Sequence, residues 1–257
     1  MCELLGMSAN VPTDICFSFG GLIRRGGATG PHRDGWGITF YEGKGARTFL
    51  EPKAASSSDI ARLVEQYPIK SKTVIAHVRR ANCGPVALEN THPFTRELWG
   101  ENWTFAHNGQ LKGVKKKRLS YYRPVGTTDS EHAFCWILDG LRRRNPRGSK
   151  HTADSFLKNA LDELNELGIC NVLLTNGKKL YAYCSTEICF ITRQAPFGEA
   201  VLVDKDWQVD FKKETSRKDV VTIIATRPLT SNEHWDVLFP GELKVFCDGR
   251  PKKASPP

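Results

Sequence analysis

The sequence lacks any apolar run of the roughly 18 or more residues needed to span a bilayer. Glu3 stands where a secretion signal would carry basic residues, and no apolar stretch follows it. Hydrophobic residues make up 40% of the 257 residues and charged residues 25%, as in ordinary globular proteins. We therefore expect a cytoplasmic globular protein that has no membrane partner.

No C-x-x-C pair occurs among the eight cysteines. The closest pair, Cys184 and Cys189, has no second pair or histidines nearby, so a zinc site is not expected. Irregular spacing in a chain of this size favours reduced thiols over a disulfide framework. We expect neither a metal nor any other cofactor.

Several common functional motifs are also missing. The sequence contains neither of the glycine-rich phosphate loops, G-x-x-x-x-G-K-[ST] and G-x-G-x-x-G. The motifs G-x-S-x-G and H-E-x-x-H are absent as well. These absences argue against the commonest nucleotide-binding, serine hydrolase and zinc protease classes.

The formal net charge is +9, and it is concentrated in residues 112–118, 142–150 and the C-terminal tail. Such runs can hold nucleic acid or an acidic surface. They contain no interleaved aromatic residues and match no nucleic-acid-binding motif, so solvated loops and helix ends explain them better. A basic binding module without enzymatic activity remains an alternative. Residues 252–257 have the composition of a loose tail.

Hydrophobic periodicity predicts strands, then two long helices, then more strands. Short helices are predicted from Thr13 or Asp14 to the glycines at 26–27, and from the three serines at 56–58, which can cap the helix, to just before Pro68. The long helices are 129–144 and 153–168, the second ending at Gly168. Strands are predicted over 2–9, 35–42, 46–52, 73–78, 103–109, 171–184 (a hairpin), 187–192, 199–204, 207–211, 220–226 and 243–247.

Local signals support this order. Thr128 and Glu131 have the spacing of a capping box at the start of the first long helix. Asn176-Gly177 predicts a hairpin turn, as does the segment 43–45. No linker or repeat divides the chain, so we predict one α+β domain over residues 2–251, with helices packed on a sheet or a pair of sheets.

Polar residues follow predicted strands or begin a predicted helix, where rigid scaffolds commonly present functional groups. They are Arg79, Arg80, His107, Asn108, Gly109 and Asp129. Cys2 is small enough for Met1 to be removed, which would leave Cys2 with a thiol and a free α-amine. Together these residues supply a nucleophile, a base, an amide beside a glycine N–H, and one group of each charge. Acyl transfer from a zwitterionic substrate requires such a set.

Seven further sequence blocks follow Cys2 in order. They are DGWG (34–37), AHVRRA (76–81), NTHPF (90–94), FAHNGQL (105–111), GTTDSE (126–131), PLT (228–230) and PGEL (240–243). With Cys2, they resemble the class II, N-terminal nucleophile glutamine amidotransferases over nearly the whole chain, above all the small stand-alone YafJ-like members. The resemblance implies an Ntn-hydrolase fold, a four-layer αββα sandwich of two stacked sheets covered by helices.

The resemblance also implies roles for the site residues. Cys2 is the expected nucleophile, with the Asn108 amide and the Gly109 N–H stabilising the oxyanion. Arg79 is expected to hold the α-carboxylate of glutamine by two parallel hydrogen bonds, and Asp129 its α-ammonium. His92 is expected to brace the substrate pocket. His77 and His107 lie on apolar strands and are expected to be core histidines.

The chain departs from many synthase-linked relatives in two respects. Arg80, Asn82 and Cys83 replace a tryptophan, a threonine and a histidine, which leaves the side contacts of the pocket open. We expect no second synthase domain that would use ammonia. We therefore expect either a separate ammonia-accepting synthase as partner, or hydrolysis of a γ-glutamyl amide or peptide with a different leaving amine.

Overall fold

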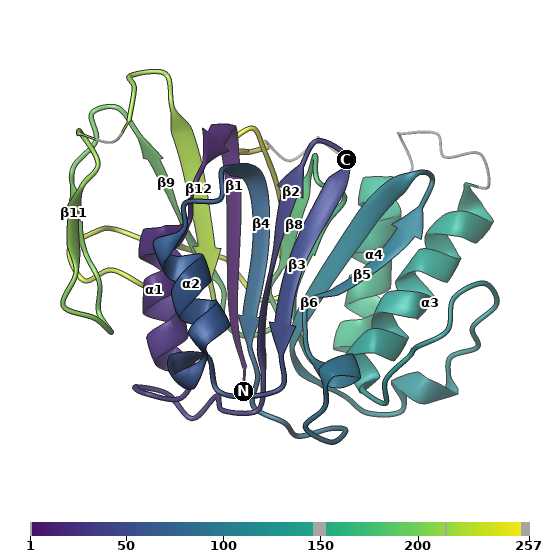
Figure 1. The fold of residues 1–257 in the computed structure, drawn as a ribbon. Helices are drawn as coiled ribbons and strands as arrows, with labels where there is room; N and C mark the ends of the chain where they lie inside the picture. Colours follow the sequence, from purple (N-terminus) through teal and green to yellow (C-terminus); the bar gives the residue numbers. More distant parts are fainter. Residues whose placement is uncertain (1, 146–152, 214, 253–257) are drawn as a thin grey trace.

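Two antiparallel β-sheets lie face to face, and helices cover the outer face of each (Figure 1). The computed structural model describes residues 2–145, 153–213 and 215–252. No helix in these ranges is long and apolar enough to cross a membrane. The succession of helices, sheet, sheet and helices confirms the predicted αββα sandwich.

The first sheet has seven strands in the order β13-β9-β12-β1-β4-β2-β3. Their bounds are Asp236–Val237 (β13), Cys189–Gln194 (β9), Val220–Ala225 (β12), Glu3–Thr13 (β1), Ser71–Val78 (β4), Trp36–Glu42 (β2) and Gly45–Glu51 (β3). Helices α1 (Cys16–Arg25) and α2 (Asp59–Gln66) cover its outer face. A short 3-10 turn, η1 (Ala55–Ser57), precedes α2.

The second sheet has six strands in the order β15-β14-β8-β7-β6-β5. Their bounds are Arg250–Pro251 (β15), Leu243–Cys247 (β14), Leu180–Tyr183 (β8), Gly168–Thr175 (β7), Glu101–Leu111 (β6) and Phe94–Leu98 (β5). Helices α3 (Asp129–Arg144) and α4 (Ala153–Asn165) cover its outer face. Two 3-10 turns, η2 (Leu88–Asn90) and η3 (Val114–Lys116), flank β5 and β6.

A separate two-stranded hairpin completes the described structure. It consists of β10 (Glu199–Val201) and β11 (Gln208–Asp210), and its strands pair antiparallel. Phe17 of α1 makes edge contacts with the rings of Trp207 and Phe211, whose centroids lie 5.5 and 5.6 Å away. The hairpin is therefore packed against the outer helix layer of the seven-stranded sheet.

Strand alternation decides which side chains enter the space between the sheets, because successive strand residues point to opposite faces. In β1, Leu5 and Met7 pack with α1 and α2, whereas Leu4 belongs to the core between the sheets. In β6, Phe105 packs under α3 and Ala106 belongs to the core between the sheets. Side chains two residues from Leu4 and Ala106 therefore face the same interior.

Most predicted elements are confirmed, but the sequence does not predict β5, β13 or β15, and several boundaries differ, two of them at helix ends. The first helix begins at Cys16, later than predicted, because β1 continues to Thr13, which still pairs with Ser71 beyond an irregularity in the ladder. The second long helix ends at Asn165. Gly168 instead opens β7, where an added Cβ would lie 2.2 Å from the Gln110 carbonyl oxygen.

The capping box is half formed. Thr128 Oγ1 accepts the Glu131 N–H at 3.1 Å, as predicted. The Glu131 carboxylate does not return to Thr128 but accepts the N–H groups of Val125 and Gly126 at 3.0 and 2.7 Å. It thereby fixes the segment that leads into α3.

Two of the predicted segments fall partly outside the described residues. Of the predicted loose tail only Lys252 is described, and of the basic run 142–150 only residues 142–145, which end α3. The domain limits at residues 2 and 251 stay a prediction.

Candidate active site

Cys2 lies directly before β1, where the pairing with β4 ends. The last paired positions are Glu3 and Val78, so Cys2 lies beside the residues that follow β4. The Arg80 N–H donates to Cys2 Sγ at 3.3 Å, and the Arg80 carbonyl oxygen lies 3.5 Å from the same sulfur. The thiol is partly exposed. It is thus held by backbone groups yet open to a reactant.

Burial raises the pKa of the Cys2 thiol above its ordinary value. The backbone N–H of Arg80 and the charge of Arg79 act in the opposite direction, and Asp34 raises the pKa further. A raised pKa keeps the thiol protonated at neutral pH, and the thiolate is the reactive form of cysteine. Were this thiol to act as a nucleophile, a base would have to take its proton.

Asn108 is fully buried in β6, and alternation directs its side chain into the space between the sheets, like that of Ala106. Neither its Oδ1 nor its Nδ2 has a hydrogen-bond partner among the described residues. Buried polar side chains are nearly always paired, so this amide is available to a bound molecule. Its backbone is fixed, because Asn171 Nδ2 donates to the Asn108 carbonyl at 3.3 Å.

Gly109 follows Asn108 at a place where no side chain fits. A Cβ added there would lie 1.8 Å from the Ile169 carbonyl oxygen on the neighbouring strand β7. A glycine therefore allows β6 and β7 to pair closely at this point. The predicted role of the Gly109 N–H stays a prediction.

The Arg79 guanidinium is buried among backbone carbonyl oxygens. Its two terminal nitrogens donate to the carbonyls of Asp34, Cys83, Gly84 and Pro85 at 3.0 to 3.4 Å. Arg79 thus anchors the segment 83–85. A glutamine carboxylate would have to displace some of these carbonyls or use the remaining Nε–H, and the predicted carboxylate binding stays a prediction.

Three buried histidines lie close together behind the site. The His77 and His92 rings have centroids 4.4 Å apart, and His92 is also 4.4 Å from Phe94. Burial, with the nearby charges of His32, His107 and Arg79, lowers the pKa of His77 to about 3. Burial likewise holds the pKa of His92 well below its ordinary value. Both rings are therefore held neutral; His77 was expected to be a core histidine, and the predicted role of His92 at the substrate pocket stays a prediction.

His107 connects the Asn108 strand to α3. Its Nε2–H donates to the Ile169 carbonyl at 3.0 Å, so Nδ1 accepts from the Ser130 hydroxyl at 2.8 Å. Burial lowers the pKa of His107, and the charge of Asp129 partly offsets this. His107 is therefore buried and bonded at both ring nitrogens, as predicted for a core histidine, and lies within range of the Asp129 charge.

Asp129 is the first residue of α3 and is nearly buried. Its carboxylate accepts the Leu111 N–H at 2.7 Å and the Ser130 N–H at 3.0 Å. These bonds join the end of β6 to the start of α3. Asp129 is linked through its contacts to the Asn108 strand, and its predicted role toward a substrate ammonium stays a prediction.

Asp34 is a site residue to which the sequence analysis assigned no role. Its Oδ2 accepts the Ala81 N–H at 2.7 Å, and its own N–H donates to the Arg79 carbonyl at 3.0 Å. Asp34 thus fixes the backbone turn that carries Arg80 against Cys2. The DGWG block contained it, but an aspartate before glycine is also common in ordinary turns.

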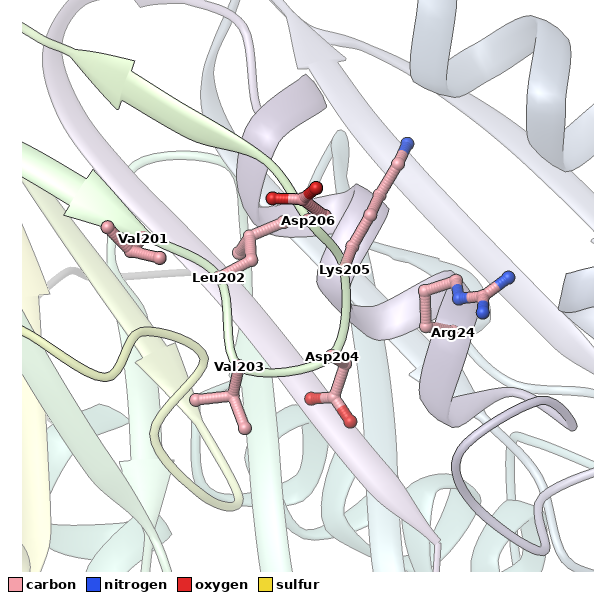
Figure 2. A pocket seen from close by; sticks show the side chains of 7 residues that line it. All are labelled: Arg24, Val201, Leu202, Val203, Asp204, Lys205 and Asp206. Carbon is pink, nitrogen blue, oxygen red and sulfur yellow. The ribbon is translucent and has the colours of Figure 1, made fainter.

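Two hollows of the described structure are lined by none of the predicted site residues. A hollow of about 480 Å³ is lined in part by Thr91 and Pro93, the neighbours of His92, and by Glu131. A hollow of about 390 Å³ between Arg24 and the segment 201–206 contains none of the predicted site residues (Figure 2). Within the described ranges, no group of three or more His, Cys, Asp or Glu residues is placed to hold a metal.

Comparison with known proteins gives consistent matches. Residues 1–256 match the family model for class II glutamine amidotransferases. The chain is 60% identical to the YafJ protein of Escherichia coli K12 over 251 residues, which cover 97% of this chain and 98% of that protein. Because these matches run along almost the whole sequence, they identify the family of the whole chain and not of one segment.

Solved structures agree with the fold. The 2.0 Å crystal structure of a predicted glutamine amidotransferase from Pseudomonas aeruginosa PA01 is 48% identical and superposes with a TM-score of 0.77, covering 97% of this chain and 99% of that one. Glutamine phosphoribosylpyrophosphate amidotransferase from Bacillus subtilis gives a TM-score of 0.62 at 16% identity, covering 98% of this chain and 48% of that longer one. The second likeness shows the fold alone.

The buried histidines predict a loss of stability at mildly acid pH. His77 stays neutral in the folded protein down to about pH 3 but protonates in the unfolded chain near pH 6.5, so the unfolded state binds more protons between these values. From pH 7 to pH 5, His77 alone should lower the free energy of unfolding by about 2 kcal/mol. Urea unfolding of the wild type and of His77→Phe at both pH values measures this difference.

The exposed His234 provides the matched control, since His234→Phe also removes one histidine. It should leave the pH dependence of the wild type in place. The account of the buried cluster would be contradicted if His77→Phe and the wild type lost equal stability between pH 7 and pH 5.

Proposed function

Because this chain belongs to the class II glutamine amidotransferases, we propose that it releases the side-chain amide of glutamine through a γ-glutamyl thioester on Cys2. The observation that carries the proposal is the Cys2 sulfur, bonded to the Arg80 backbone just before β1, together with the buried Asn108 amide that has no partner among the described residues. Cys2 adjoins a strand of one sheet and Asn108 lies in a strand of the other, so the strands hold both backbones in place.

The base in this mechanism is the α-amine of Cys2 after removal of Met1. An ordinary α-amine has a pKa of about 7.7–8.0, close enough to that of a thiol to accept its proton directly or through water. The sulfur attacks the amide carbon, and the amine passes the proton to the departing nitrogen as the C–N bond breaks. Water then cleaves the thioester to give glutamate and restores the thiol.

The charge that develops on the amide oxygen needs hydrogen-bond donors already in place. Asn108 Nδ2 is such a donor, because it is buried and has no partner among the described residues. The Gly109 N–H is proposed as the second donor. Preorganised donors stabilise a developing oxyanion without reorganisation at the moment of reaction.

Substrate recognition is assigned to the charged residues around these groups. Arg79 is proposed to meet the α-carboxylate and Asp129 the α-ammonium, with His92 as a neutral wall of the pocket. The contacts of Arg79 with the segment 83–85 give it a second effect, because a carboxylate that replaced a carbonyl would also shift this segment. Binding and loop order are then coupled.

The alternative is hydrolysis of a γ-glutamyl amide or peptide with a larger leaving amine. Arg80 and Asn82, which follow Arg79 next to the thiol, are both exposed. An open side next to the nucleophile leaves room for a longer leaving group. Ammonia from glutamine would pass either to water or to a separate synthase. A cytoplasmic location stays a prediction; the eight cysteines are free, which fits a reducing compartment.

Removal of Met1 should be necessary for turnover. A peptide-bonded nitrogen cannot act as a base, so a preparation that retains Met1 should release no glutamate above the level of Cys2→Ala. The measurement is glutamate formation by processed and unprocessed preparations whose state has been verified by intact mass. Normal glutamine hydrolysis by protein that fully retains Met1 would show that the α-amine is not the base.

Substitutions at Asn108 and Arg79 should separate chemistry from binding. Asn108→Ala removes a donor to the developing charge and should lower kcat by roughly 10²–10³. Arg79→Ala should mainly raise KM, because the carboxylate charge does not change during the reaction. Steady-state kinetics with glutamine measures both. The assignment fails if Asn108→Ala changes only KM while Arg79→Ala changes only kcat.

A substrate panel should decide between the two leaving groups. We expect free glutamine to be hydrolysed, and an open pocket predicts comparable or higher kcat/KM for γ-glutamyl amides and peptides. The measurement is glutamate release across the panel at equal enzyme concentration. A clear preference for free glutamine, with a co-purifying synthase that stimulates turnover, would overturn the hydrolase alternative and support an amidotransferase subunit.

A further inference from the structure

A group of charges centred on the buried Glu3 carboxylate lies next to Cys2 in the sequence. Glu3 is only 1% exposed. Arg25 donates to Glu3 Oε2 at 3.2 Å, and Arg227 Nε donates to Glu3 Oε1 at 3.1 Å. Arg25 Nε also donates to Asp204 Oδ2 at 2.7 Å. Two carboxylates and two guanidinium groups therefore balance, and we call these four residues the Glu3 clamp.

The clamp draws its members from four separate parts of the chain. Glu3 begins β1, Arg25 ends α1, and Arg227 follows β12. Asp204 lies in the loop between β10 and β11, where Figure 2 shows it near the end of the helix that carries Arg24. The Arg25 guanidinium is completed by the carbonyl oxygens of residues 227 and 228. Such a junction fixes the position of Glu3 relative to the helix layer and the loop.

The clamp also holds the strand at the point where its ladder ends. β1 pairs with β12 as far as Leu5, and the Leu4 N–H then donates to Thr226 Oγ1 at 2.9 Å. The Thr226 N–H donates back to the Leu4 carbonyl at 3.2 Å. Glu3 is the residue of β1 next to Cys2, and its carboxylate bonds to Arg25 and Arg227. Chain ends fray unless they are tied down, so these bonds determine how well Cys2 is placed.

We propose that Glu3, held by Arg25 and Arg227, is a positioning residue that keeps the Cys2 thiol in reach of the Arg80 N–H and of the substrate. This inference rests on the proposed function, in which Cys2 is the nucleophile. Alternation directs the Glu3 side chain to the helix side and the Cys2 side chain to the interior, so Glu3 acts through the backbone and does not touch the substrate.

Misplacement of a reacting group by about 1 Å can cost roughly 10²-fold in rate. Glu3→Gln keeps the shape of the side chain but removes the charge that two guanidinium groups share. It leaves the positive charge of the clamp unbalanced, so β1 should shift at its start. Since substrate contacts are made by other residues, kcat should fall while KM changes little.

The test compares Glu3→Gln with a variant at a matched ion pair. Arg193 Nε and Nη2 donate to Glu233 at 2.8 and 2.6 Å, and both side chains are largely buried. In the sheet, Arg193 pairs with Val221, and Val221 pairs with Ala9. Ala9 is about seven strand residues from Cys2, so this ion pair lies roughly 20 Å from Cys2. Glu233→Gln therefore breaks a similar buried pair without approaching the site.

We expect Glu3→Gln to lower kcat for glutamine by roughly 10- to 100-fold with KM within about threefold of the wild-type value. Glu233→Gln should leave kcat within about twofold even where its loss in Tm is as large. If Glu3→Gln does not fold, Arg227→Ala replaces it, because this partly exposed member removes only one arm of the clamp. Arg227→Ala should lower kcat roughly three- to tenfold.

The proposal is overturned if kcat is unchanged in Glu3→Gln or, where that variant does not fold, in Arg227→Ala. It is also overturned if Glu233→Gln reproduces the loss of kcat, because general destabilisation then explains it. Glutamate release by the wild type, abolished in Cys2→Ala, is measured first. Its absence would refute the proposed function itself, which keeps the two failures distinct.

Discussion

The packing of two antiparallel sheets face to face is the constraint on which the rest of the molecule depends. Because side chains alternate along β1 and β6, Leu4 and Ala106 enter the shared core, and alternation predicts the same side for Asn108, two residues along β6. The polar groups needed for chemistry are thus placed at the margin of an apolar interior. Rigid strands on both sides keep them there.

Burial also changes the pKa values and the hydrogen bonding of these side chains. It raises the pKa of the Cys2 thiol, lowers those of three histidines, and leaves the Asn108 amide without a partner among the described residues. Each of these states costs stability, since charged or unpaired polar groups are disfavoured away from water. A site of this kind favours a neutral resting nucleophile and strengthens hydrogen bonds made during the reaction.

Much of the fold could be predicted from local patterns, because periodicity and caps act within a few residues. The Thr128 cap and the hairpin at 43–45 illustrate this. The start of α1 could not, since pairing between Thr13 and Ser71 extends β1 at the expense of the helix. The αββα arrangement came from resemblance to a family and not from periodicity, which gave only one α+β domain.

Part of the candidate site, like part of the fold, could be predicted from the sequence. Blocks such as FAHNGQL point to Asn108 and Gly109, and the resemblance of the whole set of blocks points to Cys2; these roles stay predictions. The ion pairs of Glu3 could not be predicted, because its partners lie 22 and 224 residues away in sequence. Such partners are determined by the packing of distant segments, which no local motif encodes.

The central claim is that Cys2 carries the acyl group during turnover. The most direct measurement is acid quenching of the processed enzyme during turnover of glutamine, followed by intact-mass and peptide mass spectrometry. The account predicts a population heavier by one γ-glutamyl group, located on Cys2 and removed by hydroxylamine. Sustained turnover with no adduct in the wild type, in slow Asn108→Ala or at low temperature, or an adduct on another residue, would contradict it.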